Sequence, residues 1–338
     1  MNTAHHTSFI QPHRIDVHHH IIPTIYLEAL RRQGIADPIP GVDFPAWDVQ
    51  TTLAMMDRQG IATAMVSISE PGVYFGNVAL ARDLARQLNE FSARLVADHP
   101  QRFGAFAVLP LPDVEAALRE LAYALDTLKL DGIGLLTNYR GTYLGDAALD
   151  ALFAELNRRQ VATFIHPSTP PSKDQPTFGL PPSLYEFTFD TTRTVVNLLY
   201  SGTLDRYPNV RLILSHAGGT VPYLAKRLTF GPVIGSYLKA RAPQNLIASL
   251  RQLYYDVATS ASPYALPSLQ ALVDPSHILF GSDYPFMPEA GVADNVAGLA
   301  DYEGFDQQAR GKIERENARA LFPRLQPVRE ILFTREGS

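Results

Sequence analysis

Short apolar runs alternate with amphipathic stretches along most of the chain. Such runs are typical of buried parallel strands, and amphipathic stretches with a period near 3.6 are typical of the helices that cover them. The runs that we expect to form strands lie at 15–20, 62–69, 103–109, 132–136, 161–166, 210–216, 253–257 and 277–281. Eight strands separated by helices predict an α/β fold, a (β/α)8 TIM barrel.

A doubly wound open sheet is the alternative to a barrel. The turn after the first strand reads HHHIIP, whereas doubly wound folds that bind nucleotides have a glycine-rich phosphate loop there. The barrel is therefore favoured, as a single domain over 1–338 with a core from about 14 to 322.

Two proline-rich loops, 35–47 and 167–190, interrupt this alternation. The second leaves directly from the end of the predicted fifth strand, which places it on the C-terminal rim of a barrel, where ligands bind. We expect the first loop beside it, with surface decoration as the alternative for both.

The composition is that of an ordinary globular protein. Of 338 residues, 46% are hydrophobic and 19% charged, and the net charge of -5 gives no basic footprint for nucleic acid. No run approaches the length of a membrane span, and the N-terminus lacks the apolar segment of a secretory signal. The absence of cysteine excludes disulfides and thiolate ligands. We therefore expect a cytoplasmic protein with no membrane or nucleic-acid partner.

Three consecutive histidines end the first predicted strand. Because side chains alternate along a strand, His18 and His20 share one face, with their side chains starting about 7 Å apart, and His19 points to the other face. Two imidazoles so placed can converge on one metal ion. The alternative is a solvated histidine-rich region.

The same pattern recurs at three other predicted strand ends. His166 ends the fifth strand, His216 ends the sixth, and Asp283 follows the eighth. All strand ends of a barrel point to one rim, so these residues are expected to converge there. Imidazole and carboxylate ligands at one site suit Zn²⁺, Mn²⁺ or Fe²⁺.

The segments DVHHHIIP, FIHPSTPP, LSHAGGTVPY and ILFGSDYPF together resemble the amidohydrolase superfamily. They are most similar to its branch of aminocarboxymuconate-semialdehyde, γ-resorcylate and 6-methylsalicylate decarboxylases. The resemblance implies a homodimer and one divalent metal ion per chain, with zinc expected and manganese or iron as alternatives. It places His216 beside the metal as a proton-transfer residue. The metal ligands that it implies are His18, His20, His166 and Asp283.

Two absences agree with the decarboxylase branch. Binuclear hydrolases of the superfamily carry a bridging lysine at the end of strand four, where this chain reads GIGLLTNYR and has Lys129 at the opposite end of the strand. Deaminase-like members place a glutamate just after the histidine of strand five or six. Here the corresponding segments HPSTPP and HAGGTV contain no glutamate.

The resemblance also indicates a substrate class. Aminocarboxymuconate-semialdehyde decarboxylases carry a carboxylate-binding arginine where this chain has Thr52, whereas TNYRGTYLGD is similar to the 6-methylsalicylate type. We expect a non-oxidative decarboxylase of a small aromatic or unsaturated acid, favouring an ortho-hydroxybenzoate that chelates the metal through carboxylate and phenol oxygens. Either Asp283 or His216 would deliver the proton to carbon.

Several aromatic and polar residues on the rim segments could contact such a substrate, although ordinary packing is the alternative for each. They are Asn138, Tyr143, Tyr185, Phe187, Phe189, Arg193 and Phe286.

Two other functions use the same constellation. A hydrolase of a lactone or amide would attack with metal-bound water, whose pKa a metal lowers to about 7. A non-catalytic scaffold would not be expected to keep every ligand position intact.

Overall fold

The structure is a computed structural model that describes residues 13–39, 42–171 and 176–325. Eight of its strands form one parallel sheet in which neighbours along the chain are neighbours in space. These strands are β1 (Arg14–His20), β2 (Ile61–Ser67), β3 (Phe103–Val108), β4 (Gly132–Leu136), β7 (Ala162–His166), β8 (Arg211–Leu214), β9 (Tyr254–Asp256) and β10 (Ile278–Leu279). A doubly wound sheet would reverse its strand order partway, so this order excludes it.

The sheet closes on itself between its first and last strands. The backbone N–H of Val17 donates to the carbonyl oxygen of Phe280 over 2.9 Å, and that of His20 donates to Tyr284 over 2.7 Å. In return, the N–H of Asp283 donates to the carbonyl oxygen of His18 over 2.8 Å. These bonds complete the predicted (β/α)8 barrel.

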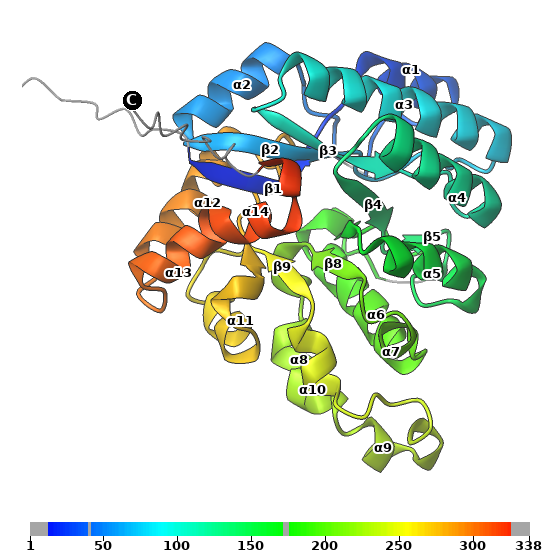
Figure 1. The fold of residues 1–338 in the computed structure, drawn as a ribbon, viewed down its shortest axis with the longest axis vertical. Helices are drawn as coiled ribbons and strands as arrows, with labels where there is room; N and C mark the ends of the chain where they lie inside the picture. The colour runs from blue at the N-terminus through cyan, green and yellow to red at the C-terminus, as the bar shows by residue number, and fades with distance from the viewer. Residues whose placement is uncertain (1–12, 40–41, 172–175, 326–338) are drawn as a thin grey trace, which may run out of the picture.

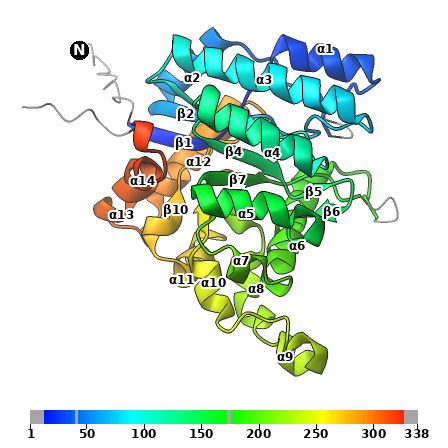
Figure 2. The same cartoon turned by 45° about the vertical axis from the view of Figure 1, so that its right-hand side comes forward.

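Helices surround the barrel, as Figure 1 and the turned view of Figure 2 show. Their bounds are α1 (Thr24–Arg32), α2 (Val49–Arg58), α3 (Val78–Asp98), α4 (Val114–Ala122), α5 (Asp150–Arg159), α6 (Glu186–Tyr200), α7 (Thr203–Arg206), α8 (Val221–Leu228), α9 (Gly231–Ile234), α10 (Leu246–Arg251), α11 (Leu266–Leu272), α12 (Glu289–Asp301), α13 (Gln307–Gly311) and α14 (Asn317–Leu321). A small hairpin, β5 (Asn138–Tyr139) and β6 (Thr142–Tyr143), follows β4. The segment around α9 projects from the body of the molecule in both views.

Apolar side chains fill the barrel and close one of its ends. Val17, Phe106 and Phe164 belong to the same buried cluster as Leu321 and Phe322 at the C-terminal end of α14. The rings of Phe106 and Phe322 lie 5.7 Å apart between centroids. Because this end is sealed by packing, the opposite end, where the strands finish, is left for the polar side chains.

The predicted strands all exist, with ends that differ by a few residues. The strand predicted at 210–216 ends earlier, at Leu214, because His216 has a left-handed backbone with φ of 54° that a strand does not allow. The loop predicted at 167–190 is also shorter, since α6 begins at Glu186 and buries Phe187 and Asp190 on one face. Within the described residues, no helix is both long and apolar enough to cross a bilayer.

Candidate metal centre

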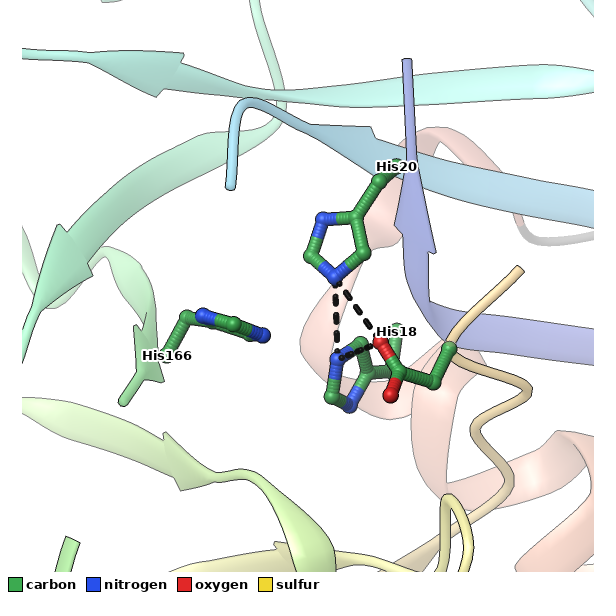
Figure 3. Close-up of side chains that lie close together, drawn as sticks. His18, His20 and His166 are labelled. Atoms are coloured by element: carbon green, nitrogen blue, oxygen red, sulfur yellow. Dashed lines mark hydrogen bonds and ion pairs between the residues drawn. The ribbon is translucent and has the colours of Figure 1, made fainter. Parts of the chain in front are cut away.

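Three imidazoles and one carboxylate meet at the carboxyl ends of the strands. His18 and His20 come from β1, His166 from the end of β7, and Asp283 from the segment after β10, and their ligand atoms all lie within 4.8 Å of one another. Figure 3 shows the three rings turned toward one another. Oδ1 of Asp283 lies 3.1 Å from Nε2 of His18 and 3.2 Å from Nε2 of His20. The structure thus brings together the four residues that the sequence analysis named as ligands.

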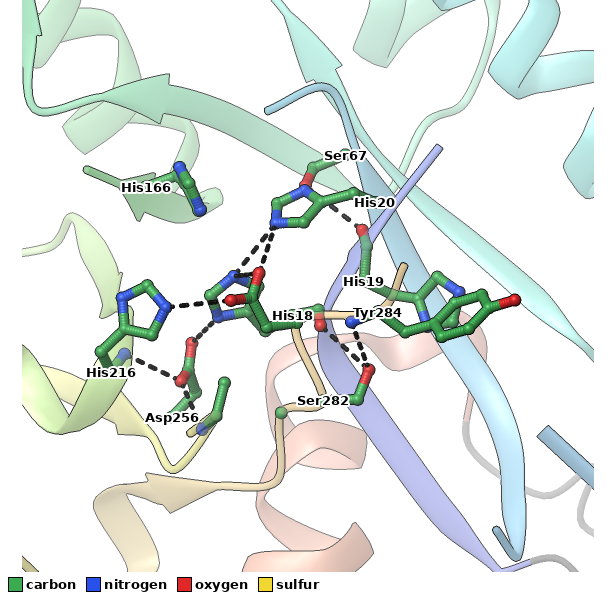
Figure 4. Close-up of polar contacts among 12 residues, drawn as sticks. His18, His19, His20, Ser67, His166, His216, Asp256, Ser282 and Tyr284 are labelled. Carbon is green, nitrogen blue, oxygen red and sulfur yellow. Dashed lines mark hydrogen bonds and ion pairs between the residues drawn. The ribbon is translucent and has the colours of Figure 1, made fainter. Parts of the chain in front are cut away.

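Hydrogen bonds on the outer nitrogens fix how these rings point. Nδ1 of His18 lies 2.9 Å from Oδ2 of Asp256, and Nδ1 of His20 lies 3.0 Å from Oγ of Ser67 (Figure 4). Nδ1 of His166 donates to the carbonyl oxygen of the next residue over 2.8 Å. With each Nδ1 engaged, the three Nε2 atoms face a common centre, which is the arrangement of ligating histidines in metalloproteins.

The charges of the cluster depend on the neighbouring carboxylates. Burial lowers the pKa of His18, but the carboxylates of Asp256 and Asp283 outweigh burial and raise it to about 10. Burial lowers the pKa of His20 to about 4. Burial opposes ionisation of Asp283, yet the charge and hydrogen bond of His18 hold the pKa of that carboxyl well below its usual range. A metal ion would displace the proton of His18, and the three imidazole nitrogens with the ionised carboxylate then form a donor set that fits a divalent transition metal.

His216 lies beside this cluster. Nε2 of His216 lies 3.4 Å from Oδ2 of Asp283. The backbone N–H of His216 donates a hydrogen bond to Oδ1 of Asp256 over 3.0 Å. Its left-handed backbone turns the chain sharply after β8, and Gly219 continues the turn with φ of 63°. A Cβ at Gly219 would stand 2.1 Å from the carbonyl oxygen of Thr188, so only glycine fits this turn.

His19 points away from the cluster, as the alternation of β1 predicts. Its Nδ1 lies 2.9 Å from Oδ2 of Asp16, and its ring packs against Tyr284 with centroids 5.2 Å apart. The side chain is fully buried. The alternative of a solvated histidine run is therefore wrong for residues 18–20.

A cavity of about 430 Å³ opens over the metal centre and contacts His166, His216 and Asp283. Much of its wall is apolar, including Phe187 and Phe286. Loop 35–47 contributes to the wall as predicted, and loop 167–190 does so too, through the residues Ile39, Val42, Pro181, Ser183 and Leu184. The volume lies in the range of small-molecule sites.

Among the described residues that line this cavity, Phe187 and Phe286 are the two that the sequence analysis named as substrate contacts. Tyr143 and Asn138 instead donate hydrogen bonds to the buried carboxylate of Asp190. Arg193 donates to Glu186 over 3.2 Å. The remaining two aromatic candidates are Tyr185, whose hydroxyl donates to the carbonyl oxygen of Pro176, and Phe189, whose side chain is exposed.

The sequence analysis missed the residues that hold the ligands in place. Asp256 and Ser67 contact the rings of His18 and His20. Asp16 accepts hydrogen bonds from the backbone and side chain of Ser282, which fixes the segment that carries Asp283. The available signal was a carboxylate inside an otherwise apolar predicted strand, at Asp16 in IDV and Asp256 in YYDV.

Known proteins match this chain over nearly its whole length. The amidohydrolase family model matches residues 15–324. A 6-methylsalicylic acid decarboxylase of Penicillium expansum is 36% identical over 320 residues, covering 93% of this chain and 98% of its own.

Solved structures share the fold. An amidohydrolase II structure superposes with a TM-score of 0.85 at 32% identity, covering 91% of this chain and 99% of its own. A 5-carboxyvanillate decarboxylase of Novosphingobium aromaticivorans, complexed with manganese and a nitrobenzoic acid, superposes with a TM-score of 0.80 at 23% identity, covering 92% of this chain and 96% of its own.

Proposed function

This chain belongs to the amidohydrolase family. We propose that it is a metal-dependent, non-oxidative decarboxylase of small aromatic acids, like the relative from Penicillium expansum. The substrate that we propose is an ortho-hydroxybenzoate such as a 6-methylsalicylate-like acid. The observation that carries the proposal is the group of His18, His20, His166 and Asp283 beneath a cavity with apolar walls. The 6-methylsalicylic acid decarboxylase at 36% identity supports the reaction class.

The reaction replaces the carboxylate of the ring with a proton. A proton is added to the carbon that bears the carboxylate, the carbon–carbon bond breaks, and carbon dioxide leaves as the ring regains its aromaticity. Asp283, after it takes up a proton, is the leading proton donor, and His216, 3.4 Å from its Oδ2, is the other candidate. The two groups face each other across a hydrogen-bonding distance, so a proton given up by one can be restored by the other.

The metal, when bound, supplies the positive charge that neutralises the carboxylate and phenol oxygens of the substrate. The described residues that line the cavity include no lysine or arginine. A substrate carboxylate therefore needs that charge. The walls supplied by Phe187 and Phe286 suit an aromatic ring.

We propose zinc as the metal, with manganese and iron as the competing ions. The nitrogen-rich donor set supports zinc, and manganese is the metal of the related 5-carboxyvanillate decarboxylase. We also propose a cytoplasmic location and one functional domain over the whole chain.

We propose a homodimer as well. The projecting segment around α9 and the neighbouring α8 expose large apolar side chains, with Val233 and Tyr223 each 82% exposed and Tyr237 72% exposed. Apolar patches of this kind are typical of protein interfaces. The molar mass in solution, measured by light scattering, tests this assembly.

The decisive experiment assays the purified protein with a panel of ortho-hydroxybenzoates while its metal content is measured on the same sample. We expect carbon dioxide release that depends on metal and falls when the metal is removed by a chelator. A parallel lactone and amide panel tests the hydrolase alternative. Acid release from a lactone without any carbon dioxide from the benzoates would overturn the proposed function.

A further inference from the structure

A second cavity, of about 630 Å³, lies on the same rim of the barrel. Its walls come from the segments after α1, β2, β4 and β7, and no described residue lines both this cavity and the one over the metal centre. The two cavities are nevertheless close, since Ser69 lines the first and Glu70 the second. The volume of the second cavity also lies in the range of small-molecule sites.

An acid in the wall of this cavity has no cationic partner. Oε2 of Glu70 accepts a hydrogen bond from the backbone N–H of Thr169 over 2.8 Å. Within the described chain, no lysine, arginine or histidine forms an ion pair with Glu70. The carboxyl group of this cavity-lining residue therefore has remaining acceptor capacity.

Arg140, in the same wall, also has no ion-pair partner among the described residues. The guanidinium carbon of Arg140 lies 6.0 Å from the centroid of the Tyr74 ring, and no described carboxylate forms an ion pair with this arginine. A Cβ at Gly76 would stand 3.0 Å from a guanidinium nitrogen of Arg140, so the glycine leaves room for this position. An arginine without a carboxylate partner presents two parallel donors that match a ligand carboxylate.

Aromatic surface completes the chemistry of the wall, because Tyr74, Phe75 and Tyr139 line the cavity as well. Glu70 and Arg140 line the same cavity and form no ion pair with each other, so each can bind a different polar group of one ligand. We propose that this second cavity is a non-catalytic binding site for a hydroxy-aromatic carboxylate. The carboxylate of the ligand binds Arg140, its hydroxyl donates to Glu70, and its ring packs against the tyrosines.

The positions of the two groups on the ring distinguish the two cavities. A hydroxyl ortho to the carboxylate suits a shared metal ion, whereas a hydroxyl at the far end of the ring can bind a second protein group that is not paired with the first. The probe for the second cavity is therefore 4-hydroxybenzoate, which lacks the ortho oxygen. This binding site is independent of the proposed decarboxylation.

The test is calorimetric titration of 4-hydroxybenzoate into the metal-free protein. We expect one molecule bound per chain, with at least tenfold weaker binding in Arg140→Gln and weaker binding also in Glu70→Gln. Glu70→Gln keeps an oxygen that can accept from Thr169 and removes only the charge. Arg158→Gln, which alters an exposed arginine paired with Glu155, is the matched control and should bind as the wild type does.

Kinetics with the metal-loaded protein separate this proposal from the proposed function. Saturating 4-hydroxybenzoate should leave the KM for an ortho-hydroxybenzoate unchanged, and Arg140→Gln should keep the wild-type decarboxylation rate. Absence of binding, binding that neither variant weakens, or competitive inhibition that survives in Arg140→Gln would each overturn the second site. Binding with the expected variant pattern but no decarboxylation of any benzoate would instead leave this site intact and refute the proposed function.

Discussion

The carboxylate of Asp256 offers a direct test of how the metal centre is held together. This fully buried side chain lies 2.9 Å from Nδ1 of His18, and its other oxygen accepts from the backbone N–H of His216 and Ala258 over 3.0 and 2.9 Å. One carboxylate therefore orients a metal ligand and anchors the residue proposed to transfer protons. We predict that Asp256→Asn weakens metal binding without unfolding the protein.

The magnitude follows from what the amide loses. Asparagine has the size of aspartate but carries no charge, so Nδ1 of His18 loses its carboxylate partner and the ring becomes a poorer donor to the metal. Removing such outer partners of ligating histidines typically costs 10–100-fold in metal affinity. This corresponds to about 1.4–2.8 kcal/mol of binding free energy.

The assay is a titration of the metal-free protein with zinc and with manganese against a chelator of known affinity, together with a thermal melt. Asp190→Asn is the matched control, because Asp190 is an equally buried carboxylate that accepts hydrogen bonds from Asn138 and Tyr143 and from no metal ligand. We expect Asp190→Asn to lower the melting temperature and to keep the metal affinity of the wild type. Unchanged affinity in a folded Asp256→Asn protein would refute the role assigned to this contact.

Four further outcomes are expected. His18→Ala should lose most of its bound metal, measured by elemental analysis, whereas His19→Ala should retain its metal. The His19→Ala protein should instead lose about 1–3 kcal/mol of unfolding free energy, because a buried hydrogen bond is broken. Equal metal loss in both variants would contradict the register of β1. His216→Asn should keep near-stoichiometric metal and lose roughly 10²–10⁴-fold in single-turnover rate, and loss of metal there would make His216 a ligand. Salicylate-type acids should release carbon dioxide while their para-hydroxy isomers do not, and comparable turnover of both would count against chelation. Burial raises the pKa of Glu70 in the folded protein to about 7, above its ordinary 4.5, so this residue destabilises the fold progressively as the pH rises from 4.5 to 7. Glu70→Gln should therefore be more stable than the wild type at pH 8, by at most about 3 kcal/mol of unfolding free energy and by less where solvent screens the charge. Urea melts at pH 4 should show no gain.

The metal ligands could be predicted from the sequence because a barrel brings the ends of all its strands to one rim. His18, His166 and Asp283 are far apart along the chain, but each stands where a parallel strand finishes. Every such position faces the same rim whatever the exact strand bounds, so errors of a few residues at strand ends did no harm. The face of β1 that carries His18 and His20 followed from alternation alone.

The aromatic contacts could not be predicted in the same way, because they depend on a helix start. Taken as parts of a loop, Tyr185, Phe187 and Phe189 were equivalent candidates. In the structure α6 begins at Glu186, and residues two apart on a helix point to nearly opposite sides. Phe187 therefore lines the cavity over the metal centre, while Phe189 is exposed.

The sequence also could not predict which residues form hydrogen bonds with each other when they are far apart along the chain. Asn138 and Tyr143 carry groups suited to a substrate, but their donors reach Asp190 on α6, more than 45 residues further along the chain. The same holds for the pair of His18 and Asp256, which are 238 residues apart. Such pairs depend on how far one strand or helix is shifted along its neighbours, and apolar patterning does not encode that shift.

The closure of the barrel and the placement of Asp283 are one structural feature. β10 contains only two residues, and the chain then pairs with β1 through the backbone of Asp283 and the carbonyl oxygen of His18. Asp16 reinforces this seam by accepting from the N–H of Ser282 over 3.0 Å and from its hydroxyl over 2.5 Å. A change that loosened the seam would therefore move the carboxylate ligand relative to the histidines of β1. Because the donor atoms must stay within a fraction of an ångström of their positions to bind one ion, the fold and the metal site should be lost together when this seam opens.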